Sequence, residues 1–284
     1  MNIPARIEAT QFPGGKRIAV TTSFDDGVVQ DRRVIAAFNE WGLKGTFNLN
    51  SGLLLRTGKP ATASTGHIDA CEVSELYRGH EVAVHGYSHP FLEKLDNAQI
   101  VREVLEDRIA LEDLVGYPVR GMAYPFGTYD QRVIDALRSL GIVYARTCEV
   151  NSRHFPPRDP YQWASNGHMF SATPKSVPDR FADFHNNPHS TGVYFIWGHT
   201  YEFENRWADL EKIFKPLAGK PDVWYCTNIE LFDYETARQR LVVAANRASV
   251  FNPSALTVTI NVAGKLLDVP AGKTLALDNA AALR

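Results

Sequence analysis

Short apolar runs rich in β-branched residues alternate with helical patterns along most of this chain. The alternation predicts parallel strands joined by crossover helices, because a parallel neighbour can be reached only through a crossover. Helical spacing of apolar residues marks Val34–Trp41, Ile100–Ile109 and Val133–Leu140. Seven such units fit either a barrel or an open doubly wound sheet. The predicted strands are Ile18–Ser23, Gly45–Asn50, Glu81–Val84, Val119–Tyr124, Ile142–Arg146, Val193–Trp197 and Asp222–Cys226.

The last part of the chain has a different pattern of apolar and polar residues. A predicted helix near Leu231–Ala248 is followed by period-two alternation over Leu256–Val262 and by a hairpin turn at Ala263–Lys265. This pattern predicts a small β appendage. Further upstream, Glu149–Pro174 is the longest irregular stretch, and we expect it to form a wall or lid of a functional site.

Composition narrows the class of protein. The chain has 284 residues and a formal net charge of -2, from 30 basic and 32 acidic residues. No dense block of Lys and Arg is present, which argues against nucleic acid as a partner. No run approaches the ~18 apolar residues of a membrane span, and the first residues lack a leader pattern, so we expect a cytoplasmic protein. The three cysteines, Cys71, Cys148 and Cys226, are far apart and are expected to be reduced and buried.

Polar residues follow the carboxyl ends of the predicted strands. Asp25 and Asp26 follow the first strand, His85 the third, Arg146 ends the fifth and His199 follows the sixth. In parallel β/α folds the catalytic groups gather at that end. The sequence therefore predicts a site at this rim.

Asp25, Asp26 and His85, together with the nearby His89, suit a metal site. His85 and His89 are four residues apart, so both rings can reach one ion if the segment forms a helical turn. Taken alone, such a pair is more often a surface feature, and Asp25-Asp26-Gly27 is more often a helix cap. Because both features fall on the same rim, a shared cation explains them better. One carboxylate and two imidazoles leave positions open for water, and the other carboxylate is free to act as a base.

The remaining histidines are weaker candidates for the site. His199 at a strand end can serve as a general acid, or it is a core histidine bound to a carbonyl. His67, His154, His168, His185 and His189 lie in loop-like segments and are expected at the surface, with His154 and His168 as further candidates for substrate contact.

From Arg17 to Tyr234 these residues, in this order, resemble the NodB-type polysaccharide deacetylase family, which is carbohydrate esterase family four. Ser23–Gly27 resembles the block that supplies a base and then a ligand, which implies Asp25 as base and Asp26 as ligand. The His85 to His89 segment resembles the His-x-x-x-His block and completes the metal set. Ala123–Gly127 is a weaker counterpart of Arg-x-Pro-Tyr-Gly and implies the Phe126 N–H as an oxyanion donor. Trp197-Gly198-His199 resembles Leu-x-His and implies His199 as the acid.

The chain departs from the family pattern at two blocks. Ala123 stands where the family has the arginine that holds the base, so Arg146, or less favourably placed Arg120, is expected to supply a guanidinium. The fourth block has no clear counterpart, although Trp163 lies in the right interval. The residues expected to line the substrate pocket are Trp197, Tyr124, Tyr87 and Trp163.

The resemblance implies a fold, a cofactor and a reaction. The expected fold is a distorted (β/α) barrel of about seven parallel strands over residues 1–250, with the β appendage at 251–284. The expected metal is zinc, with cobalt or nickel as alternatives. The expected reaction is removal of N- or O-linked acetyl groups from a carbohydrate. Alternatives are hydrolysis of a small or cyclic amide, a catalytically impaired carbohydrate-binding relative and, less favoured, a non-haem iron oxygenase. A homo-oligomer formed through an edge of the appendage stays open.

Overall fold

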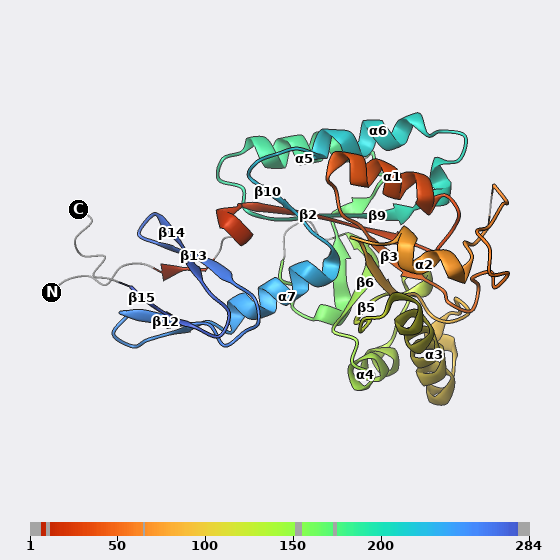
Figure 1. Cartoon of the computed structure of the whole chain (residues 1–284), viewed down its shortest axis with the longest axis horizontal. Coiled ribbons are helices and arrows are strands. Elements are labelled where there is room, and N and C mark those ends of the chain that lie inside the picture. Colours follow the sequence, from red (N-terminus) through yellow and green to blue (C-terminus); the bar gives the residue numbers. More distant parts are fainter. Residues whose placement is uncertain (1–6, 10–11, 65, 151–154, 173–174, 278–284) are drawn as a thin grey trace.

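A closed barrel of parallel strands forms the centre of the molecule (Figure 1). The computed structural model describes residues 7–9, 12–64, 66–150, 155–172 and 175–277. Nine strands belong to the main sheet, and every printed pairing within it is parallel. These strands are β2 (Ile18–Asp25), β3 (Thr46–Leu49), β4 (Glu81–Val84), β5 (Gly121–Ala123), β6 (Tyr144–Val150), β7 (Trp163–Ser165), β8 (Gly167–His168), β9 (Gly192–His199) and β10 (Val223–Tyr225).

The barrel closes through a segment that was predicted to be irregular. β7 and β8 are consecutive pieces of one extended segment, of which β7 pairs with β6 and β8 pairs with β9. The interpretation of Glu149–Pro174 as an irregular stretch was therefore wrong, although residues 151–154 and 173–174 lie outside the described part. The seventh predicted strand, β10, pairs only with the first residues of β2, beside β3 on the same edge.

Helices cover the outside of the barrel. Phe24 of β2 and Phe47 of β3 point outward and pack with Phe38 and Phe214, with ring centroids 5.1 to 5.8 Å apart. Because side chains alternate along a strand, the residues between these aromatics face the interior. The helices are α1 (Asp31–Trp41), α2 (Val73–Leu76), α3 (Asn97–Val115), α4 (Gln131–Ser139), α5 (Val177–Asn186), α6 (Ala208–Phe214) and α7 (Asn228–Gln239). The short 3-10 turns are η1 (Pro13–Gly15), η2 (Ala70–Glu72), η3 (Leu92–Lys94), η4 (Pro125–Gly127), η5 (Pro160–Gln162), η6 (Thr200–Phe203) and η7 (Lys215–Leu217).

Helix α7 packs against the amino-terminal end of the barrel. Its Leu231 belongs to a buried cluster with Tyr144, Trp163 and Phe195 from the strands. Its first backbone N–H groups bond to polar side chains inside the barrel, including Ile229 N to Glu81 Oε2 at 2.8 Å. The helix ends at Gln239, so the predicted continuation to Ala248 was wrong. The barrel is therefore open for a site only at the carboxyl ends of its strands.

The appendage consists of two small antiparallel sheets at one end of the molecule (Figure 1). The predicted hairpin is confirmed as β13 (Val258–Val262) and β14 (Lys265–Val269), turning through Ala263 and Gly264 in the left-handed region. β1 (Ile7–Glu8) joins this hairpin from the other end of the chain, which the sequence patterns did not indicate. The second sheet contains β11 (Val242–Val243), β12 (Ser249–Phe251) and β15 (Thr274–Ala276). The domain boundary at residue 250 stays a prediction.

Two further expectations concern cysteines and membranes. The cysteines are free, as predicted, but only Cys226 is buried, whereas Cys148 is half-buried and Cys71 is exposed. Among the described residues, none of the helices has the length and apolar character needed to cross a membrane.

Candidate active site at the carboxyl ends of the strands

Asp25 ends β2 and points into the mouth of the barrel. Strand register places it between Asn48 of β3 and His199 of β9. Its Oδ1 accepts a hydrogen bond from Asn48 Nδ2 at 2.8 Å, and its Oδ2 accepts one from Arg146 Nη2 at 2.5 Å. Both Asp25 and Arg146 are buried, so this is an ion pair within the protein. Of the two arginines considered for this role, the structure selects Arg146.

The buried carboxyl of Asp25 is ionised at neutral pH. Burial alone would raise its pKa, because the charged form loses its hydration. The positive charges of Arg146, His85 and His199, together with the hydrogen bond from Arg146, outweigh that effect, and the pKa lies below its usual value. Asp25 is therefore a carboxylate with a fixed orientation.

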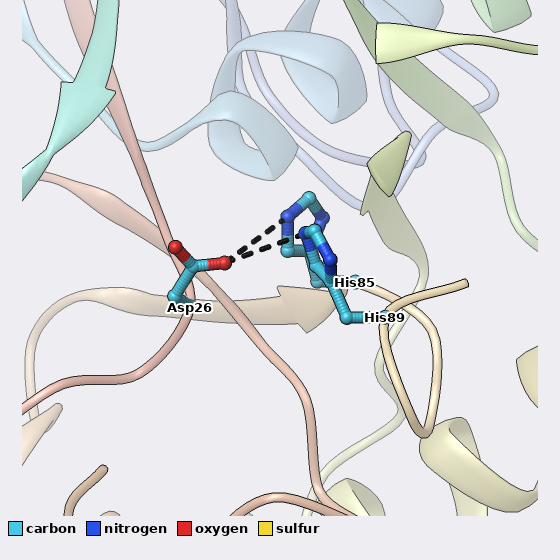
Figure 2. Close-up of side chains that lie close together, drawn as sticks. All are labelled: Asp26, His85 and His89. Carbon is cyan, nitrogen blue, oxygen red and sulfur yellow. Dashed lines mark ion pairs between the residues drawn. The ribbon is translucent and has the colours of Figure 1, made fainter. Parts of the chain in front are cut away.

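Asp26, His85 and His89 point toward one another (Figure 2). Asp25 is close to this group, with its Oδ2 3.9 Å from His85 Nε2. Asp26 Oδ1 lies 3.6 Å from His85 Nε2 and 3.5 Å from His89 Nε2. These distances are too long for hydrogen bonds, which are about 2.7–3.2 Å. Ligands about 2.1 Å from a zinc ion in tetrahedral geometry lie about 3.4 Å from one another. The spacing therefore fits three ligands of one metal ion.

The ring of His85 is oriented for metal binding. Its Nδ1 lies 2.8 Å from the carbonyl oxygen of Ala123 and must donate the proton, so Nε2 carries the free lone pair. Burial lowers the pKa of His85, although the carboxylates of Asp25 and Asp26 oppose this, which favours the neutral ring that a metal requires. Ala123 thus contributes its backbone at the position where the family arginine is missing.

The segment from His85 to His89 reaches this geometry without the helical turn that we expected. It is an irregular bend with positive φ at Gly86 and at His89. Asn50 Nδ2 donates to the carbonyls of His85 and Gly86, both at 2.6 Å. At the other end of the bend, the carboxylate of Glu103 accepts bonds from Ser88 N and Ser88 Oγ. Polar contacts from Asn50, just after β3, and from Glu103 of α3 therefore hold the bend.

The backbone at Asp26 adopts a conformation that non-glycine residues rarely take. Its φ is 82°, and its N–H donates to the Asn48 carbonyl at 3.0 Å. Its own carbonyl accepts a bond from His67 Nδ1 at 3.0 Å. His67 was expected at the surface with no role, but it holds the turn that carries Asp26.

His199 lies on the other side of Asp25 and has a carboxylate partner that the sequence did not reveal. Its Nε2 is 3.9 Å from Asp25 Oδ2, and its Nδ1 donates to Glu202 Oε2 at 3.1 Å. The same Glu202 oxygen accepts from His168 Nε2 at 2.9 Å and from the backbone N–H of His199 at 3.0 Å. Glu202 therefore orients the His199 ring, and His168 holds the same carboxylate oxygen. His154, the other histidine proposed for substrate contact, lies outside the described residues.

The partners of His199 change its titration. Burial alone would lower its pKa, but the hydrogen bond that His199 donates to Glu202 and the charges of Asp25 and Asp26 outweigh burial, so the pKa is raised. For Glu202, burial would raise the pKa, but bonds from both histidines lower it. The pair therefore favours a protonated His199 beside an ionised carboxylate, as a general acid needs.

Phe126 lies in the tight turn η4, directly after β5. Its φ of 58° is in the left-handed region, and its ring lies 4.5 Å from the His89 ring. The turn is thus adjacent to the candidate metal ligands. The role of the Phe126 N–H as an oxyanion donor stays a prediction.

Four residues that were predicted to belong to the site make their contacts elsewhere and do not join the cluster. Arg120 pairs with Asp233 at 2.6 Å rather than with Asp25. Trp163 packs in the barrel interior against Tyr144 and Phe195. The structure brings neither of them to the cluster. The Tyr124 ring is also buried, and its hydroxyl donates to the Tyr161 carbonyl, whereas the Tyr87 ring packs against Gly52.

Trp197 is the one predicted pocket residue next to the cluster. Its ring centroid is 4.5 Å from the guanidinium carbon of Arg146 and 4.9 Å from the His168 ring. It therefore forms part of the wall between the base and the acid.

Comparisons with known proteins agree with the class that the barrel and its site define. Residues 13–145 match the model of the polysaccharide deacetylase family. A curated relative, the peptidoglycan-N-acetylglucosamine deacetylase PgdA of Listeria monocytogenes, is 26% identical over 140 residues, covering 48% of this chain and 27% of the relative. The chain thus spans about a quarter of the length of that curated relative. Residues 13–145, just under half of the chain, thus resemble the polysaccharide deacetylase family.

Solved structures confirm the fold. A Mycobacterium smegmatis protein classed as a polysaccharide deacetylase superposes with a TM-score of 0.56 at 18% identity, over 84% of this chain and 96% of that one. A family 4 acetyl xylan esterase from Clostridium thermocellum, solved with a cobalt ion, gives a TM-score of 0.52 at 16% identity, over 78% and 92% of the two chains. The predicted β/α barrel is therefore confirmed.

Proposed function

We propose that this protein is a metal-dependent deacetylase that removes acetyl groups from an N- or O-acetylated carbohydrate. One observation carries the proposal. The ligand atoms of Asp26, His85 and His89 have the spacing of a metal site, and a fixed carboxylate and a histidine with a raised pKa lie beside them. A site for activating water thus adjoins both a base and an acid.

The donor set fits a divalent transition metal. One carboxylate and two neutral imidazoles are the ligand types of hydrolytic zinc sites, and cobalt and nickel accept the same donors. When bound, such an ion would polarise the acyl carbonyl and lower the pKa of a water to about 7. Asp26, His85 and His89 would hold it.

Asp25 would act as the base. Arg146 and Asn48 each hold one of its oxygens, which fixes the carboxylate and leaves lone pairs to accept a proton from the attacking water. Because Arg146 lowers the pKa of Asp25, the base is ionised over the whole neutral range. The proton then leaves the water as the carbon–oxygen bond forms.

His199 would act as the acid. Glu202 accepts a hydrogen bond from Nδ1–H of His199, so that Nε2, which lies toward Asp25, is the atom that donates its proton to the departing nitrogen or oxygen. The Phe126 N–H would stabilise the oxyanion, a contribution that typically changes the rate by about 10²–10³. Trp197 would line the acyl pocket between the two groups.

The structure bears on one of the alternatives. The hypothesis of a catalytically impaired relative rested on the missing family arginine, and Arg146 supplies a guanidinium to Asp25 from the next strand. This supports an active enzyme. Hydrolysis of a small or cyclic amide would use the same residues and is decided by substrate tests.

Asp25→Asn separates catalysis from metal binding. We expect the variant to keep its metal and to lose acetate release from acetylated chito-oligosaccharides and acetylated xylan by at least about 100-fold, because the base is gone. Acetate release is measured by an enzyme-coupled assay, and metal by elemental analysis. Unchanged turnover would remove Asp25 from the mechanism, and turnover of small amides but not of acetylated sugars would favour the alternative.

A further inference from the structure

Helix α3 carries a carboxyl group in its buried stripe. The buried positions follow the helical spacing, and Ile100, Val104 and Leu111 fill three of them with apolar side chains. Asp107 fills another and is 0% exposed. Burying a carboxyl group away from water costs free energy unless hydrogen bonds replace the lost hydration. Asp107 therefore needs specific partners, and it takes no part in the chemistry proposed for the site.

The partners of Asp107 are backbone N–H groups at the ends of two neighbouring barrel strands. Its Oδ1 accepts a hydrogen bond from Ser51 N at 2.7 Å, and its Oδ2 accepts one from His85 N at 3.0 Å. Ser51 lies two residues after β3, and His85 directly follows β4, which pairs with β3. One carboxyl group thus joins the exits of both strands, and one of its two partners is a candidate metal ligand.

Further contacts hold the two strand exits against each other and against α3. Gly52 N donates to the Tyr87 carbonyl at 3.0 Å, and a Cβ at Gly52 would lie only 2.5 Å from that oxygen. Tyr87 N donates to the backbone carbonyl of Glu103 at 3.0 Å, while the Glu103 carboxylate accepts from Ser88. One turn of α3, from Glu103 to Asp107, therefore accepts hydrogen bonds along the bend that carries the candidate ligands.

Asp107 is placed to fix His85 rather than to maintain the sheet. His85 N also donates to the Leu49 carbonyl at 3.1 Å, so the hydrogen bond between the strand ends exists without Asp107. The other end of the His85 residue is fixed by the bond from its Nδ1 to the Ala123 carbonyl. With Asp107 at the backbone and Ala123 at the ring, Nε2 is directed toward Asp26. Outer contacts that orient a ligand typically change metal affinity by about 10–100-fold.

We propose that Asp107 is a positioning residue for the metal site, which orients His85 by holding the backbone of His85 and Ser51. The proposal rests on the proposed function, because it takes Asp26, His85 and His89 as the metal ligands. Asp107 acts through His85 and is not itself a ligand. Asparagine cannot replace it, since an amide offers one acceptor oxygen to two N–H donors and turns its own NH₂ group toward the second.

Metal affinity, measured without turnover, tests the proposal. Wild-type protein and Asp107→Asn are stripped of metal, and the dissociation constant for Zn²⁺ is measured by competition with a chromophoric chelator. The visible absorption spectra of the Co²⁺ forms report the geometry of the ligands. Asp113→Asn is the matched control, because it makes the same substitution at an exposed position of α3. Glu81→Gln is a second control, which changes a buried carboxyl group at the opposite end of the barrel.

The dissociation constant of Asp107→Asn for Zn²⁺ should be about tenfold higher than that of the wild type, with an altered Co²⁺ spectrum. Both controls should stay within about twofold of the wild type. Urea denaturation of the metal-free proteins shows whether each variant is folded. If Asp107→Asn does not fold, Asp107→Ala replaces it, because alanine suits the apolar stripe and also removes both acceptors.

A folded Asp107 variant that binds Zn²⁺ as tightly as the wild type would overturn the proposal, even if it were less stable. Equal weakening in Glu81→Gln would also overturn it, because the loss would then reflect general loosening of the barrel. Failure of the proposed function alone looks different. The wild type would bind Zn²⁺, Asp107→Asn would bind it more weakly, and neither would release acetate.

Discussion

The barrel buries a carboxylate at each end, and the two have opposite electrostatic surroundings. Asp25 at the carboxyl ends of the strands is paired with the guanidinium of Arg146, and its pKa is lowered. Glu81, at the start of β4, accepts bonds only from neutral groups, the Tyr144 hydroxyl, the Thr46 hydroxyl and the Ile229 N–H. Burial raises the pKa of Glu81 to about 7 despite these bonds.

The comparison shows what burial does to a carboxylate when a cation is present and when it is absent. Hydrogen bonds from neutral donors satisfy the oxygens of Glu81 but do not replace the hydration of a full charge. The guanidinium of Arg146 compensates for the lost hydration of the Asp25 charge. The charged end is the one that holds the proposed active site, and the other end is closed by α7.

The largest effect should come from removing the cation. Arg146→Met leaves the buried carboxylate of Asp25 without its cationic partner, so we expect a loss of about 3–5 kcal/mol in the free energy of unfolding. The pKa of Asp25 should then rise, and acetate release at pH 7 should fall by at least about 100-fold. Urea denaturation and steady-state kinetics measure the two effects.

Arg120→Met is the matched control for that variant. Its partner Asp233 is half-exposed, so the pair should contribute less than about 1 kcal/mol, and activity should be kept. If both variants lost the same stability and activity, Arg146 would have no special role at Asp25.

A smaller effect should come from Glu81 at the amino-terminal end of the barrel, where the pKa shift makes stability depend on pH. The pKa of Glu81 is raised from its usual value near 4.5 to about 7 in the folded protein. Between these pH values the folded state keeps a proton that the unfolded chain has lost, so stability falls as pH rises through this window, by about 3 kcal/mol at most. Glu81→Gln cannot lose a proton and should show a flatter profile. Parallel stability curves for the two proteins between pH 4.5 and 8 would contradict a raised pKa.

The smallest of the three effects should come from Glu202→Gln. The hydrogen bond that His199 donates to Glu202 raises the pKa of His199. Loss of the Glu202 carboxylate should therefore lower that pKa, and the alkaline limb of the kcat profile should move to lower pH. We expect about a tenfold lower kcat at pH 8. Glu204→Gln is the control, since Glu204 lies in the same loop but bonds Gln30. A pH profile that moves equally in both variants would show that loop structure, not the Glu202 carboxylate, sets the acid.

Much of the site could be predicted from the sequence, because strand ends in a parallel barrel meet at one rim. Asp25, Asp26, His85, His89 and His199 each follow or end a strand, and the structure brings them together.

What the sequence did not reveal depends on three-dimensional neighbours. Glu202 follows His199 by three residues, a spacing typical of a helix-capping acid, and only the fold brings His168 to the same oxygen. The closing strand was missed because β7 and β8 are very short and bend at Asn166, so they show no period. Trp163 was placed in the pocket from its interval in the chain, but register turns its ring into the core.

Metal content measured together with activity tests the central claim most directly. Elemental analysis of purified wild-type protein should give about one equivalent of zinc, cobalt or nickel per chain, and acetate should be released from acetylated chito-oligosaccharides. The His85→Ala/His89→Ala variant, which keeps Asp25 and His199, should lose both the metal and the acetate release. Wild-type protein that binds no metal, or a variant that still releases acetate without it, would contradict the account.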